Sequence, residues 1–229
     1  MHIELWSDFA CPYCYIGEAR LRRALRDLNA EDNVVVTMKS FELDPSASHE
    51  VLTTTPERFA RKYGLSQSAA ITQIEHISQL GRVEGLDFRY ATTQYSNMLD
   101  AHRLAKYAMK QGHPEINEKL FSAYFTDNLN LADHEVLTRI AAGAGLSPEK
   151  TRNILSSDSF EDEVRKDEME AACMGIHGVP YFYIDKNVAI GGAQPYDLLK
   201  TTLADLLAHE RDTAPEAAMQ CGPDGCSII

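Results

Sequence analysis

The chain of 229 residues is long enough for one large domain or two small ones, and its 44% hydrophobic and 24% charged content is that of an ordinary globular protein. Its 34 acidic and 22 basic residues give a formal net charge of −12, which disfavours nucleic acid and anionic membranes as partners. No apolar run approaches the roughly 20 residues that cross a bilayer, and the N-terminus carries no signal-peptide pattern, so with Met1 as the true start we expect a cytoplasmic protein.

The first predicted elements are a strand, a helix and a second strand. Residues 3–6 form an apolar run, and residues 15–29 place Leu21 and Leu25 on one apolar stripe at helical spacing. Residues 34–43 are β-branched and begin as a continuous apolar run, which is typical of a central strand. A strand–helix–strand unit of this length implies a parallel pair of strands.

The middle of the chain, from about residue 55 to residue 174, predicts roughly six helices with short breaks. Thr55 before Pro56 is typical of a helix N-cap, and Ser66, Asp133 and Ser147 are predicted to cap further helices. We see no internal repeat in this stretch.

Strands return near the C-terminus. Residues 181–184 and 188–190 flank a polar turn and predict a hairpin, and residues 195–209 predict a final amphipathic helix that includes Leu198, Leu199 and Leu203. The order is therefore β-α-β, helices, then β-β-α.

This order predicts an α/β, thioredoxin-like fold with a large all-helical insertion. We assign residues 1–44 and 176–210 to the thioredoxin-like core, residues 45–175 to the helical insert, and residues 211–229 to a C-terminal tail with a second cysteine pair.

Two cysteines stand where the first predicted strand turns into the first predicted helix, in the sequence Cys11-Pro12-Tyr13-Cys14. The unpaired N–H groups and partial positive charge of a helix N-terminus favour a thiolate there. We predict Cys11 as the nucleophile, because it is nearer the helix start, and Cys14 as the resolving thiol. Half of a zinc site, or two structural cysteines, is the alternative that this motif leaves open.

A proline stands directly before the third predicted strand, in Gly178-Val179-Pro180. In a thioredoxin-like core this loop faces the two cysteines, and a cis Val179–Pro180 bond would leave the Val179 backbone free to pair with an extended substrate. An ordinary trans proline at a strand edge is the alternative. We expect Val179 and Pro180, together with Pro12 and Tyr13, to bind substrate.

The tail carries Cys221 and Cys226 on either side of the turn sequence Gly-Pro-Asp-Gly, which could bring them within the roughly 4.4–6.8 Å Cα separation of a disulfide. We expect an auxiliary redox pair that exchanges with Cys11. A zinc site built from both cysteine pairs, or incidental thiols in the tail, is the alternative.

Several other residues are less informative. We expect Cys173 to be a buried packing residue and His102 to be structural or exposed. Asp8 could tune the nearby thiol, but capping of the first helix is the preferred interpretation.

Four segments, residues 7–17, 100–105, 178–182 and 192–195, together resemble the DsbA-like branch of the thioredoxin superfamily. That branch also includes 2-hydroxychromene-2-carboxylate isomerases and kappa-class glutathione transferases. The tail with Cys221 and Cys226 is similar to that of FrnE-type proteins, a cytosolic subgroup with an added cysteine pair of the same spacing.

The resemblance implies thiol–disulfide oxidoreductase or isomerase activity on protein substrates, with Cys11, Cys14 and a cis Pro180 in the family's positions, and a link to oxidative-stress defence. We expect no bound cofactor or metal, and glutathione or a thioredoxin-type protein as the reductant. The isomerase and transferase relatives generally carry serine or a lone cysteine at the position of Cys11 and use glutathione, so the presence of both cysteines favours the dithiol branch. A glutathione-dependent isomerase or transferase and a chaperone-like binding protein are the alternative functions.

Overall fold

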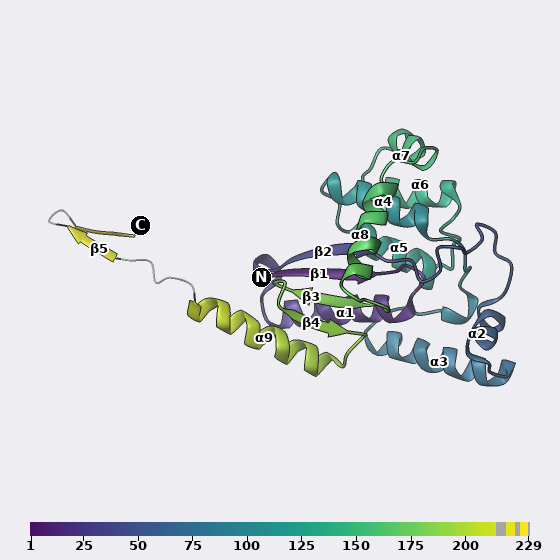
Figure 1. The fold of residues 1–229 in the computed structure, drawn as a ribbon, viewed down its shortest axis with the longest axis horizontal. Coiled ribbons are helices and arrows are strands. Elements are labelled where there is room, and N and C mark those ends of the chain that lie inside the picture. Colours follow the sequence, from purple (N-terminus) through teal and green to yellow (C-terminus); the bar gives the residue numbers. More distant parts are fainter. Residues whose placement is uncertain (214–218, 223–224, 229) are drawn as a thin grey trace.

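The computed structural model describes residues 1–213, 219–222 and 225–228, and a four-stranded sheet lies at its centre (Figure 1). The strands stand in the order β2-β1-β3-β4. β1 pairs in parallel with β2 and antiparallel with β3, and β3 and β4 form the predicted hairpin. The bounds are β1 His2–Ser7, β2 Val35–Ser40, β3 Tyr181–Ile184 and β4 Val188–Gly191.

Helices surround this sheet. The bounds are α1 Pro12–Asp27, α2 Thr55–Tyr63, α3 Gln67–Val83, α4 Leu99–Lys110, α5 Ile116–Phe125, α6 His134–Gly143, α7 Pro148–Leu155, α8 Glu161–Cys173 and α9 Tyr196–Thr213. Seven of these helices, α2 to α8, lie between β2 and β3, where the sequence predicted roughly six. The element order confirms the predicted α/β, thioredoxin-like fold with its large helical insertion. Within the described residues, no helix combines the length and the apolar character needed to cross a membrane.

The tail forms two further short strands, β5 Met219–Gly222 and β6 Gly225–Ile228. They pair antiparallel, with Cys221 opposite Cys226 in the register. In Figure 1, β5 lies beyond the C-terminal end of α9, apart from the four-stranded sheet.

The expectation that the second strand is central is wrong, because β2 lies at the edge of the sheet. Helix α8 covers its outer side: the Ser40 amide donates to Asp167 Oδ2 at 2.8 Å, and Lys39 Nζ lies 2.8 Å from Glu170 Oε2. These contacts lie at the end of β2, whereas Val35, in the apolar run that suggested a central strand, is 63% exposed. β2 also ends at Ser40, before the predicted residue 43.

Two hydrophobic cores position α1. On one face of the sheet, Leu21 and Leu25 of α1 pack with α9 and with the side chains of β1 and β3. At the other end of the helix, Tyr15 stacks on Phe121 of α5, with ring centroids 5.1 Å apart and planes 6° apart. The insert and the thioredoxin-like elements thus share a core at the end of α1 that carries the cysteines.

The predicted caps are confirmed at Ser66, Asp133 and Ser147, each of which accepts a hydrogen bond from a backbone amide of its helix. At α2 the prediction is wrong by one residue: Thr54 is the cap, in a reciprocal capping box with Glu57. Thr55 instead hydrogen-bonds the Thr93 carbonyl, because its side chain is buried.

Helix α9 offers a direct test of how this core is held, because two of its leucines differ in burial. Leu203 is fully buried, whereas Leu198, another leucine of the predicted amphipathic helix, is 52% exposed. We expect Leu203→Ala to lower the free energy of unfolding by about 2–5 kcal/mol. The matched change Leu198→Ala should cost no more than about 0.5 kcal/mol. Urea unfolding measures both values, and equal losses would show that α9 is not docked as described.

Candidate active site

The turn between β1 and α1 is held by the carboxylate of Asp8. The Ala10 amide donates to Asp8 Oδ1 at 2.8 Å, and the Leu43 amide donates to Asp8 Oδ2 at 2.6 Å. Because Leu43 follows β2, the carboxylate ties the turn to the end of the neighbouring strand. Burial raises the pKa of Asp8 to about 6, while the two backbone hydrogen bonds and Arg58 act in the opposite direction.

The expectation that Asp8 caps α1 is wrong. The N-cap residue is Cys11, and no side chain caps this helix. The Asp8 side chain is used instead by the turn before the helix and by Leu43, and its backbone carbonyl accepts from the Cys11 amide at 3.0 Å.

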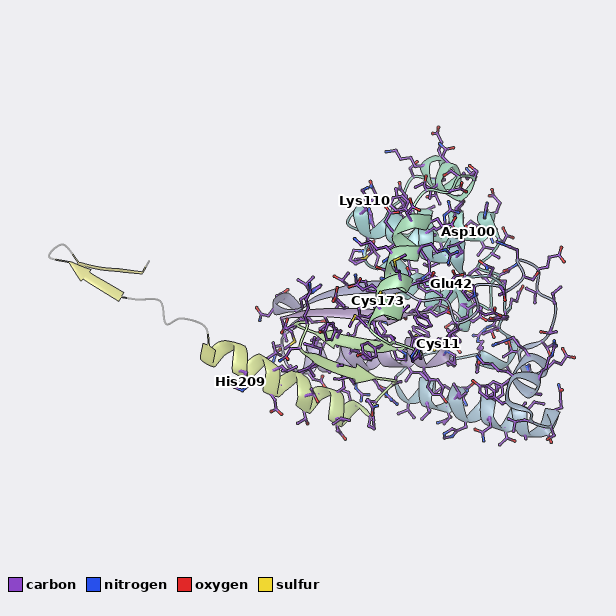
Figure 2. The ribbon with its side chains drawn as sticks, in the orientation of Figure 1. Cys11, Glu42, Asp100, Lys110, Cys173 and His209 are labelled. Carbon is purple, nitrogen blue, oxygen red and sulfur yellow. The ribbon has the colours of Figure 1, made fainter. Side chains whose placement is uncertain are left out.

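The two predicted cysteines share the first turn of α1 but differ in their surroundings. Cys11 has an extended backbone, Pro12 occupies the first helical position, and the Cys14 amide donates to the Cys11 carbonyl at 3.1 Å. Both residues are free thiols, and Cys11 lies at the end of the sheet nearest α3 (Figure 2). Both residues are buried, but Cys11 keeps 4% of its surface exposed and borders a cleft, whereas Cys14 has no exposed surface.

The burial of Cys14 separates the roles of the two sulfurs. Burial raises the pKa of the Cys14 thiol well above its ordinary value, and the adjacent Cys11 sulfur raises it further, while Ser7 and the Asp8 backbone lower it. Cys14 therefore remains a protonated thiol at neutral pH. Cys11, by contrast, is the N-cap residue at the positive end of the helix dipole and borders the cleft.

The proline loop lies against Cys11. The Val179–Pro180 peptide bond is cis, as the sequence predicted, and Cys11 Sγ donates to the Val179 carbonyl at 3.6 Å. Gly17 of α1 allows this loop to come close, because a Cβ there would lie 3.0 Å from Pro180 Cγ and 3.3 Å from Phe182 Cζ. The structure thus brings together Cys11, Cys14 and the loop that the sequence assigned to substrate.

A cleft of about 470 Å³ opens beside Cys11. Pro12, Tyr13 and Val179, three of the predicted substrate-binding residues, line one side, whereas Pro180 is buried behind the cleft wall. The other side comes from the helical insert and was not found from the sequence: it includes Arg58, Phe59, Lys62, Tyr63, Tyr90 and Tyr95. The cleft is therefore rich in aromatic rings.

The cleft is also locally cationic, although the chain as a whole is acidic. Arg58 and Lys62 are the charged residues in its lining, which includes no carboxylate from the described part of the chain. The Arg58 guanidinium lies 3.8 Å from the centroid of the Tyr95 ring, and its buried Nε has no hydrogen-bond partner in the part of the chain that is described. The Arg58 side chain also hydrogen-bonds Tyr90 and acts on the Asp8 carboxyl group. An anionic group entering the cleft would meet Arg58 and Lys62 in the same cleft as Cys11.

The remaining sulfurs and the histidine lie outside this arrangement. Cys173, expected to be buried, is exposed near the C-terminal end of α8, because its helical position points away from the face that buries Ala171. His102 is buried against Phe9, and burial lowers its pKa to about 3, in line with a structural residue.

Across the described ranges no three His, Cys, Asp or Glu side chains form a metal-binding group. The side chains of Cys221 and Cys226 lie outside the described residues.

The comparison with known proteins agrees with this geometry. Residues 2–204 match the DSBA-like thioredoxin domain, and the chain belongs to that family. The crystal structure of a probable DsbA oxidoreductase from Streptomyces coelicolor is similar over 100% of this chain and 99% of that chain, with 35% sequence identity and a TM-score of 0.87. The uncharacterized protein YwbO of Bacillus subtilis is 27% identical over 212 residues, which are 90% of this chain and 96% of that protein.

A more distant structure shares the fold alone. A 2-hydroxychromene-2-carboxylate isomerase matches with a TM-score of 0.70 and 14% identity, over 93% of this chain and 100% of that chain. That isomerase and this chain thus share one scaffold.

The unequal sulfurs give a prediction about chemical reactivity. We expect iodoacetamide at pH 7 to modify Cys11 at least about tenfold faster than Cys14, because the reagent attacks thiolates and Cys14 is both buried and protonated. Timed quenching followed by peptide mass spectrometry measures both rates, with the exposed Cys173 as an internal reference. Faster modification of Cys14 than of Cys11 would contradict the assignment.

Proposed function

We propose that this protein is a thiol–disulfide oxidoreductase that acts on disulfides of protein substrates through Cys11 and Cys14. The observation that carries the proposal is the position of Cys11, at the N-terminus of α1 and at the edge of a cleft, with Cys14 buried one turn behind it.

Reduction of a substrate would proceed in two exchanges. The Cys11 thiolate attacks one sulfur of the substrate disulfide, forms a mixed disulfide and releases the other sulfur as a thiolate, which takes a proton from solvent. The Cys14 thiol then gives its proton to solvent and attacks the Cys11 sulfur. This forms the Cys11–Cys14 disulfide, breaks the bond from Cys11 to the substrate, and releases the second substrate sulfur as a thiolate that takes up a proton. Two electrons pass from the protein to the substrate, and the reverse sequence oxidises a substrate dithiol.

The surroundings of Cys14 suit the order of these steps. The adjacent Cys11 sulfur is one cause of the raised pKa of Cys14. Once Cys11 is bonded to substrate it carries no charge, and this contribution disappears. Cys14 would thus become easier to deprotonate at the stage when it must attack.

The cleft supplies a place for the polypeptide around the reacting disulfide. Val179 accepts from Cys11 through its carbonyl, and no acceptor for the Val179 amide is found among the described residues. That amide is available to an extended substrate strand, and the aromatic side chains across the cleft would contact the flanking residues of the substrate.

Reoxidation or reduction of the pair needs a partner. We propose glutathione or a thioredoxin-type protein in this role, and a cytoplasmic location with a part in oxidative-stress defence, which the resemblance to FrnE-type proteins suggests. No bound metal or organic cofactor is required by the two exchanges.

The tail supports a further part of the proposal, an auxiliary redox pair. The backbone register of β5 and β6 places Cys221 opposite Cys226, an arrangement from which a disulfide could form. A glutathione redox titration with mass-spectrometric assignment of the cysteine pairs tests the exchange with Cys11. Failure of Cys221 and Cys226 to oxidise at any potential would remove the tail from the mechanism.

A second function, glutathione-dependent isomerisation or transfer, is favoured by one observation. Arg58 and Lys62 give the cleft two cations and no balancing carboxylate, which suits the carboxylates of glutathione. Glutathione binding that falls about tenfold in Arg58→Gln but not in Arg61→Gln, an exposed neighbour outside the cleft, together with turnover of a small aromatic substrate, would support it.

For the main proposal we expect Cys11→Ser to reduce catalysed reduction of insulin disulfides to the uncatalysed rate, because serine cannot form the mixed disulfide. The matched control, Cys173→Ser, should leave the rate within about twofold, since Cys173 lies outside the site. Turbidity of insulin in the presence of a thiol reductant measures both. Full turnover by the Cys11→Ser protein would rule the mechanism out.

A further inference from the structure

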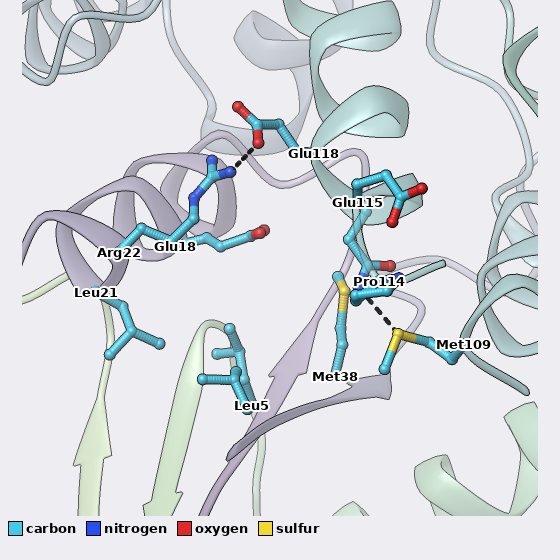
Figure 3. A pocket seen from close by; sticks show the side chains of 11 residues that line it. Leu5, Glu18, Leu21, Arg22, Met38, Met109, Pro114, Glu115 and Glu118 are labelled. Carbon is cyan, nitrogen blue, oxygen red and sulfur yellow. Dashed lines mark hydrogen bonds and ion pairs between the residues drawn. The ribbon is translucent and has the colours of Figure 1, made fainter. Parts of the chain in front are cut away.

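A second pocket, of about 250 Å³, lies between α1 and α5 above β1 and β2 (Figure 3). It shares no lining residue with the cleft beside Cys11. Its apolar walls come from the sheet and the adjoining helices: Leu5, Leu21, Val36, Met38 and Met109. The proposed thiol chemistry makes no use of this pocket.

Two hydrogen-bond acceptors on the wall of this pocket have no partner among the described residues. Glu18 Oε2 and Asn117 Oδ1 are both shielded from solvent, and Asn117 as a whole is only 8% exposed. The Asn117 amide nitrogen reaches no better acceptor than Met109 Sδ, at 3.9 Å. Unpaired buried acceptors are costly and uncommon in native proteins, so a site that holds two of them calls for a donor from outside the chain.

The charges around the pocket indicate what kind of donor it is. Glu18, Glu115 and Glu118 line the pocket, and Arg22 is the cation among its lining residues. Arg22 is ion-paired with Glu118, as Figure 3 shows, and Glu115 Oε1 lies 3.1 Å from His113 Nδ1. Glu18 Oε2 has no hydrogen-bond partner among the described residues, Arg22 included. The lining therefore favours a cation. A metal ion does not fit, because the described part of the chain has no group of three side chains arranged as metal ligands.

We propose that this pocket binds a small organic ammonium ion. Its N–H groups donate to Glu18 and Asn117, and its hydrocarbon part packs against the leucine and methionine side chains of the walls. Ligand sites of this kind combine apolar walls with a few convergent polar groups. The volume suits a ligand of the size of benzylamine.

The protonation state of Glu18 gives the site a characteristic pH dependence. Burial raises the pKa of Glu18 to about 7, Arg22 lowers it, and Glu118 raises it. Below pH 7 an entering cation must displace the carboxyl proton, whereas at pH 8 the carboxylate is already ionised. Glu118 of α5, Glu115 at the N-cap of α5 and Arg22 of α1 are the other charged groups in the lining. The Tyr15 hydroxyl of α1 also interacts with Glu18. Binding should therefore tighten as the pH rises from 6 to 8.

Benzylamine, which stays protonated over this range, is the probe for the test. We expect two-dimensional amide NMR titrations of the reduced full-length protein to show saturable shifts that map to α1, α5 and β2. The affinity should be about fivefold or more higher at pH 8 than at pH 6. Benzyl alcohol, the neutral analogue, should bind at least about tenfold more weakly, and benzoate should not bind.

Two variants separate the role of the carboxylate from the shape of the pocket. Glu18→Gln should lower the affinity for benzylamine at pH 8 about tenfold and remove the pH dependence, whereas Glu149→Gln, an exposed control on α7, should change neither. Val36→Phe should block binding by filling the pocket, which provides a second test if the Glu18 variant is unstable.

Several results would overturn the proposal. They are the absence of saturable benzylamine binding, undiminished binding by Glu18→Gln, equal binding of benzyl alcohol, and shifts that map outside the pocket.

Discussion

The first turn of α1 holds two sulfur atoms in unequal surroundings, and the chemistry of the site depends on that difference. Cys11 precedes the helix and borders the cleft, while Cys14 lies one turn later, with no exposed surface. Burial of Cys14 disfavours its thiolate form and raises its pKa, and the neighbouring Cys11 sulfur raises that pKa further. Cys11, in contrast, stands at the helix N-terminus, where the dipole favours negative charge, and borders the cleft.

The different surroundings of Cys11 and Cys14 require that the first turn of α1 is held in a fixed position. The Asp8 carboxylate secures the turn before it, Tyr15 stacks on a phenylalanine of the insert, and Gly17 lets the helix approach the proline loop. These contacts come from three distant parts of the chain. The helical insert is thus part of the active-site scaffold, and it also supplies the aromatic and cationic wall of the cleft.

Much of the fold could be predicted because its signals are local. Apolar runs and turn residues within short segments predict three features: the strand-to-helix turn around Cys11, the proline loop and the β3–β4 hairpin. The cis peptide bond at Pro180 followed from the position of the loop in the expected fold, and the structure confirms it.

Other features depend on contacts between distant segments and were missed or misread. The apolar pattern of β2 does not reveal that the strand lies at the edge of the sheet, where Ser40 hydrogen-bonds to α8. The side chain of Asp8 was predicted to cap the nearby helix, but it accepts a hydrogen bond from the amide of Leu43, which is distant in the sequence. Arg58 belongs to no recognisable sequence motif. Its position in the same cleft as Cys11 depends on how α2 packs in the folded protein, which the sequence alone did not predict. The one available signal was the amphipathic character of the helix that carries it.

The central claim, that Cys11 attacks and Cys14 resolves, is tested most directly by trapping the first intermediate. Cys14→Ser protein would be mixed with a cysteine-containing peptide disulfide, acid-quenched and digested, and the attachment site of the peptide read by mass spectrometry. The proposed mechanism predicts a stable adduct on Cys11 that forms in preference to adducts on Cys173, Cys221 and Cys226. An adduct mainly on one of those three residues, or none on Cys11, would contradict it.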